Sequence, residues 1–160
     1  MVLNEKRVHQ HLRTFERLLQ DYMAGQPLAR FLTAFYKRNK QMGSSDRRMA
    51  SRLLYHYFRL GNAAADAAPA ERLAMAEFLC SNESAVVQLL KPEWHPHITA
   101  ALPGKKAFLE THSSFRSADV FPYAAQLSAD VDQQAFVDSL FTQPDLFIRL
   151  RTPHQTAVTA

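Results

Sequence analysis

The fold is indicated most clearly by residues 44–61, which have the sequence SSDRRMASRLLYHYFRLG. Apolar residues recur here at intervals of three and four, as on one face of an α-helix: Met49, Leu53, Tyr57 and Leu60. Ser44 or Ser45 is a suitable N-cap, and Asp46 would lie at the positive end of the helix dipole. Gly61 is suited to end a helix. The stretch therefore predicts a helix from about residue 44 to residue 60.

The same helical spacing predicts further helices throughout the chain. Together with the first, the expected ranges are about 4–23, 28–40, 44–60, 70–79, 84–90, 105–111 and 128–141. Ser84 or Ser81 is the expected cap of the fifth helix, and Ser128 or Asp130 that of the last. Between residues 93 and 121 the prolines predict loops around one short helix.

A different pattern occupies residues 141–155, FTQPDLFIRLRTPHQ. Apolar residues from Leu146 to Leu150 stand between two prolines, which is typical of a short β-strand. The predicted fold class is therefore an all-α helical bundle with a short C-terminal β-strand segment.

The net charge of +4 is unevenly distributed along the 160 residues. Residues 1–61 contain twelve Lys and Arg against four Asp and Glu, whereas residues 62–160 contain seven against eleven. This asymmetry predicts a first half that faces a polyanion and a second half with another role.

Several functional classes find no support in the sequence. Cys80 is the only cysteine, so no internal disulfide can form and a cytoplasmic location is expected. No signal peptide and no membrane-spanning stretch are expected. The four glycines are isolated, which argues against a nucleotide-binding loop, and the histidine spacings argue against a metal site. No catalytic residue, metal site or cofactor site is therefore expected in this chain.

Basic residues of the second and third predicted helices form the candidate binding surface. Between Arg30 and Leu60 there are eight Lys and Arg residues and one acidic residue. Uncompensated guanidinium groups can bind phosphates, and an interleaved tyrosine can stack on a base; a merely solvated charged helix face is the alternative. The candidate RNA-binding residues are Arg30, Lys37, Arg38, Lys40, Arg47, Arg48, Arg52, Tyr55 and Arg59, with Arg149 and Arg151 in the predicted strand.

Two short motifs resemble parts of the Sun/Fmu-type rRNA cytosine-C5 methyltransferases. The stretch QPDLFIRLRTPHQ, residues 143–155, resembles the junction at which a strand opens the small RNA-contacting subdomain of that family. Arg151 stands where the family usually has asparagine. Residues 44–61 resemble a run in the NusB-like helical domain that many of these enzymes carry.

The resemblance implies a division into a NusB-like RNA-binding domain, residues 1–141, and the start of the next subdomain, residues 142–160. It further implies a chain truncated before a catalytic domain, which would hold S-adenosylmethionine and the catalytic cysteines. The implied function is to position ribosomal RNA for cytosine-C5 methylation. The implied partners are ribosomal RNA and the missing domain, and a truncated chain is expected to self-associate through its bare strand. A NusB-like protein-docking module without RNA contact is the alternative, and a free-standing enzyme is a third class.

Overall fold

The computed structural model describes residues 3–23 and 25–143, and every regular element within these ranges is helical. The elements are α1 Glu5–Asp21, α2 Leu28–Arg38, α3 Ser44–Arg59, α4 Pro69–Cys80, α5 Ala85–Leu90, the 3₁₀ helix η1 Pro92–His97, α6 Leu102–His112, α7 Ser117–Val120, the 3₁₀ helix η2 Ala124–Gln126 and α8 Gln133–Ser139. The predicted all-α class is thus confirmed for the described residues. The predicted strand lies outside them, together with Arg149 and Arg151.

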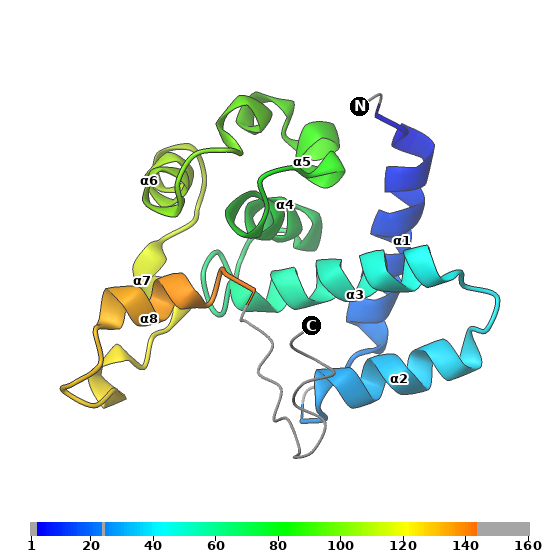
Figure 1. Cartoon of the computed structure of the whole chain (residues 1–160), viewed down its shortest axis with the longest axis horizontal. Coiled ribbons are helices and arrows are strands. Elements are labelled where there is room, and N and C mark those ends of the chain that lie inside the picture. The colour runs from blue at the N-terminus through cyan, green and yellow to red at the C-terminus, as the bar shows by residue number, and fades with distance from the viewer. Residues whose placement is uncertain (1–2, 24, 144–160) are drawn as a thin grey trace, which may run out of the picture.

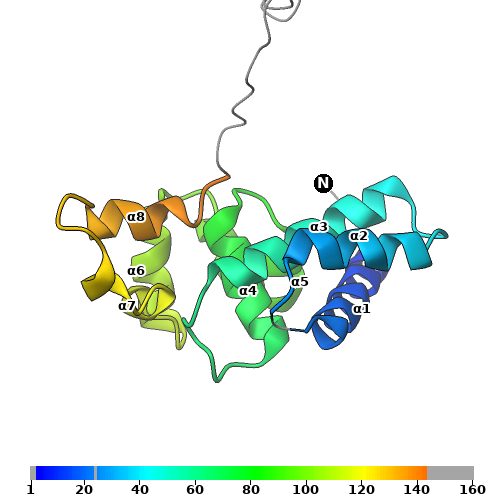
Figure 2. The same ribbon diagram turned by 90° about the horizontal axis from the view of Figure 1, so that it is seen from below.

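Helix α4 occupies the middle of the molecule. Helices α1, α2 and α3 lie on one side of it, and α6, α7 and α8 lie on the other (Figure 1). The same order is visible after a turn of 90° (Figure 2). α3 packs against both α1 and α4, and α4 also contacts α5 and α6.

The first hydrophobic cluster joins α1, α2 and α3 to one face of α4 and α5. Phe15 and Leu18 of α1 and Leu53 and Leu54 of α3 are fully buried in it. The spacing of apolar residues in the sequence predicts these helices because each needs one apolar face against the others. Met49, predicted to be buried, is only partly so, and Ala50 occupies the core position beside it.

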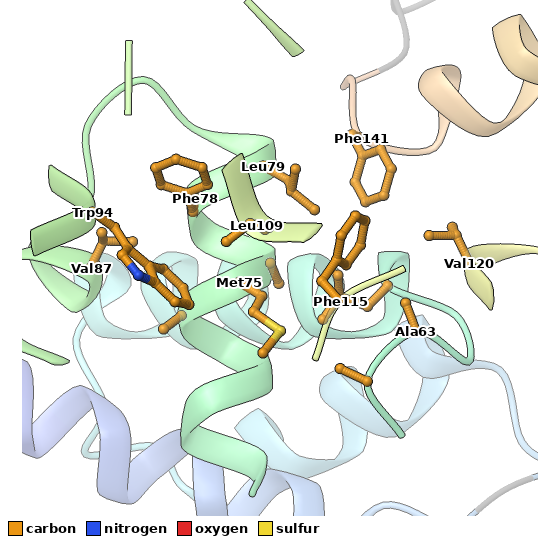
Figure 3. Close-up of a cluster of buried hydrophobic side chains, with 14 of the residues drawn as sticks. Ala63, Met75, Phe78, Leu79, Val87, Trp94, Leu109, Phe115, Val120 and Phe141 are labelled. Atoms are coloured by element: carbon orange, nitrogen blue, oxygen red, sulfur yellow. The ribbon is translucent and has the colours of Figure 1, made fainter. Parts of the chain in front are cut away.

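A second hydrophobic cluster surrounds the other side of α4. Phe78 and Met75 of α4, Trp94 of η1, Leu109 of α6 and Phe115 converge there (Figure 3). Trp94 is only 2% exposed, so this single tryptophan belongs to the core.

Helix α4 contributes residues to both clusters. Its segment from Leu73 to Leu79 is buried at every position, including Glu77. A helix that is covered on all sides must be mainly apolar, and any polar residue within it needs a partner.

Three local predictions were wrong. Gly43, not a serine, is the N-cap of α3, because the chain enters the helix in an extended conformation at that residue. Asp132 caps α8 by accepting a hydrogen bond from the Ala135 backbone, so the helix begins later than predicted. Much of the region predicted as loops is helical. Pro92 and Pro103 lie in the first turns of η1 and α6, where the missing N–H of proline removes no helical bond.

Candidate nucleic-acid interface

The C-terminal end of α2 and the first turns of α3 present a cluster of cations. Lys37, Arg38, Lys40 and Arg48 are all exposed. Within residues 3–23 and 25–143, none of the four forms an ion pair with a carboxylate. The nearby Asp46 contacts α1 instead, with its Oδ1 atom 3.3 Å from Nε2 of His11. The charges of these four side chains therefore remain available to a polyanion.

Arg47 fixes the connection between the two helices. Its Nη2 donates to the carbonyl of Lys40 at 3.2 Å, and its guanidinium lies 5.9 Å from the ring centre of Tyr36. The Tyr36 hydroxyl donates to the Arg47 carbonyl at 3.0 Å and lies 2.8 Å from Ser51 Oγ. Burial raises the pKa of Tyr36, so this phenol remains a donor at neutral pH. These bonds hold α2 and α3 in register beneath the cations.

A shallow hollow of about 420 Å³ lies beside this connection. Its lining includes Lys37, Lys40, Arg47 and the Tyr36 ring. Arg30 is also exposed but lies in the first turn of α2, about 10 Å along the helix from Lys37. Arg30 therefore does not belong to the hollow.

Arg52 corrects the expectation that the whole face is unneutralised. Its Nη2 lies 2.6 Å from Oε2 of Glu77, and its Nε lies 3.4 Å from Oε1. This bidentate pair neutralises the charge of Arg52 and ties the side chain to α4, although it remains 39% exposed. Its predicted role in RNA binding stays a prediction, but part of its side chain serves to pair with the buried Glu77.

Glu77 is fully buried and is held by three side chains. Besides Arg52, Nδ1 of His56 lies 2.6 Å from Oε1, and Ser84 Oγ donates to Oε2 at 2.7 Å. Burial by itself would raise the pKa of Glu77. The His56 hydrogen bond and the Arg52 charge outweigh burial and lower the pKa to about 2. Glu77 is therefore ionised, and because a carboxylate only accepts hydrogen bonds, His56 Nδ1 carries the hydrogen.

A second hollow, of about 530 Å³, lies along the C-terminal half of α3. It is lined by Arg52, Tyr55, His56, Arg59 and Gln143. Arg59 Nη2 donates to the neutral Gln143 Oε1 at 2.9 Å, and no carboxylate among residues 3–23 and 25–143 forms an ion pair with Arg59. Tyr55 is 41% exposed. Three predicted site residues thus share one hollow, and Arg48 lies outside it.

Cys80 is poorly suited to nucleophilic chemistry. Burial raises its pKa to about 12, so very little thiolate exists at neutral pH. In the described part of the chain, no group of three His, Cys, Asp or Glu side chains is placed to bind a metal ion. Over the same residues, no helix combines the length and apolar character needed to cross a bilayer.

Glu77 and His56 were not among the predicted site residues. A signal for Glu77 existed, because a single glutamate within the apolar run LAMAEFLC must be paired if that helix is buried. Arg52 and His56 are four residues apart, which places them on one face of α3. The sequence does not reveal that this face meets Glu77, because that contact depends on how α3 packs on α4.

Comparison with known proteins found no matching family model, no matching curated protein and no matching solved structure. The site is therefore interpreted from its own geometry and charge.

Proposed function

We propose that this chain is an RNA-binding module that grips single-stranded segments of ribosomal RNA through α2 and α3. The observation that carries the proposal is a group of exposed cations at the α2–α3 connection that pair with no carboxylate in the described part of the chain: Lys37, Arg38, Lys40 and Arg48. A solvated helix face normally mixes charges of both signs, as α1 does with Arg17 and Asp21.

The methyltransferase context rests on the resemblance of residues 44–61 and 143–155 to the Sun/Fmu-type enzymes. In that proposal the chain is an accessory part without catalytic residues, and S-adenosylmethionine would be bound by a separate domain. The chain would have a NusB-like helical fold. Its partners in the cytoplasm would be ribosomal RNA and that separate domain.

The test is the salt dependence of RNA binding. We expect the full chain to bind a single-stranded oligoribonucleotide of twelve residues, measured by fluorescence anisotropy. Because each neutralised phosphate releases counterions, log affinity should fall with log salt by about 0.7 per contact. Lys37→Gln and Arg48→Gln should each reduce that slope by about 0.7 and weaken binding roughly fivefold.

Arg13→Gln is the matched control, because Arg13 is an exposed arginine on α1. Arg13→Gln removes the same charge as the two test substitutions. If RNA binds only at α2 and α3, it should leave the salt dependence of the affinity unchanged, because Arg13 lies on α1. Equal effects of all three substitutions would indicate non-specific attraction to net charge and would contradict the proposal. If the wild-type chain does not bind RNA even at low salt, the proposal is also contradicted.

A protein-docking function is the second candidate. The observation that favours it lies in the segment between α7 and α8, where Tyr123 is 54% exposed and Val131 is 38% exposed, with Asp130 and Asp132 on either side of Val131. The test is binding of the chain to a separately expressed catalytic domain. Docking is the better assignment if the chain binds that domain, if Tyr123→Ser abolishes the binding, and if the chain does not bind RNA.

A further inference from the structure

The hollow on the C-terminal half of α3 combines an exposed tyrosine with two arginines and a histidine. Its volume of about 530 Å³ lies within the roughly 300–1,000 Å³ typical of small-ligand sites. Its lining offers a phenol ring, two guanidinium groups and an imidazole. A planar aromatic surface beside cations suits a base and its phosphate together.

The two guanidinium groups of this hollow are not equivalent. Arg52 is neutralised by Glu77 and held by two hydrogen bonds, so its direction is fixed before any ligand arrives. Its Nη1 makes no hydrogen bond within residues 3–23 and 25–143 and so remains a free donor. Arg59 forms no ion pair with a carboxylate among the same described residues. Its charge therefore suits a phosphate, whereas Arg52 is a donor whose direction is already fixed.

The hollow lies on the same side of α3 as Arg48, because Arg48, Arg52, Tyr55 and Arg59 follow one another at intervals of four, three and four residues. Arg47, next to Arg48, lines the hollow at the α2–α3 connection. From Arg47 to Arg59 α3 rises roughly 18 Å, which about five stacked nucleotides would span.

We infer that the hollow at Arg52, Tyr55 and Arg59 holds one unpaired nucleotide of the RNA, with its base stacked on Tyr55 and its phosphate at Arg59. The inference rests on the proposed function and specifies it. A base must leave the duplex to stack in this way, so the preferred ligand is single-stranded RNA.

The experiment uses the full chain and a uridine hexaribonucleotide with one central 2-aminopurine, whose fluorescence is quenched by stacking. Wild-type protein should quench the probe on binding. Tyr55→Ala should weaken binding roughly 5- to 100-fold and abolish the quenching while leaving the salt slope unchanged. Tyr55→Phe retains the aromatic ring and should therefore retain both the affinity and the quenching. Arg59→Gln should instead lower the salt slope by about 0.7.

The outcomes separate the two proposals. If Tyr55→Ala binds and quenches as the wild type does, the nucleotide pocket is refuted while RNA binding through α2 and α3 stands. If wild-type protein does not bind the hexamer or longer RNA at low salt, both proposals fail. A duplex of the same length that competes equally well would also refute the pocket. Circular dichroism confirms folding of each variant, and none of the three substitutions replaces a core residue.

Discussion

At the scale of single residues, Glu77 is a carboxylate that is fully buried between helices. A fully buried carboxylate is costly unless it is paired and hydrogen-bonded, and Glu77 receives bonds from Arg52, His56 and Ser84. The same carboxylate joins α3 to α4 and orients Arg52 toward the proposed nucleotide pocket.

Glu77 predicts an acid-sensitive fold. Its pKa is about 2 in the folded chain against an ordinary 4.5, so the unfolded state takes up the proton first as pH falls. The resulting stabilisation, about 3 kcal/mol, is fully present above about pH 4.5 and is lost as pH falls from there towards 2. Urea unfolding between pH 7 and pH 2.5 measures this loss.

Glu77→Gln is the control for that measurement. It should be less stable than the wild type at pH 7, because Arg52 loses its counter-charge, and its stability should depend less steeply on pH below 4.5. Parallel pH profiles for the two proteins would show that other carboxyl groups dominate the acid response.

At the scale of elements, the end of α3 is constrained by its contact with α7. Gly61 has a φ of 54°, and a Cβ placed on it would lie 1.9 Å from the carbonyl oxygen of Val120. Glycine is therefore required both for the left-handed turn and for the close approach.

Gly61→Ala is expected to destabilise the chain by about 3–5 kcal/mol, since backbone strain adds to displacement of α7. Gly25 is a matched comparison, because its φ is 100° but no atom of the described residues, its chain neighbours aside, lies within 4 Å of the position that a Cβ would take there. Gly25→Ala should therefore cost only the strain, about 1–2 kcal/mol. Thermal unfolding of both variants tests this, and equal losses would exclude a steric role for Val120.

At the scale of the whole molecule, the two hydrophobic clusters share one helix. Leu73 of α4 belongs to the first cluster and Met75 and Phe78 to the second. If α4 unfolded, the apolar residues of both clusters would be exposed to water. We therefore expect the described helices to unfold in one cooperative transition.

The single tryptophan makes this testable. Trp94 lies in the second cluster, whereas circular dichroism reports on all helices. Unfolding curves in urea followed by tryptophan fluorescence and by far-ultraviolet circular dichroism should coincide. A fluorescence transition separated from the circular dichroism transition would mean that the clusters fold independently.

Much of the fold could be predicted from local patterns. The spacing of Leu12 and Phe15 predicts α1, and of the two serines expected to cap α5, Ser84 and Ser81, it is Ser84 that does so. The cap of α3 could not be foreseen, because Ser45 and Asp46 face α1: Ser45 Oγ accepts from Arg7 and Asp46 contacts His11. Such contacts join residues far apart in the chain and leave no local signal.

The sequence by itself determined the helical class, most helix positions and the excess of cations in the second and third helices, because each depends on residues a few positions apart. Only the tertiary structure decided which cations remain free. Arg48 and Arg52 are four residues apart on the same helix, yet α4 brings a buried carboxylate to Arg52 and none to Arg48. Charge in the sequence is local, but its neutralisation depends on which helices pack together.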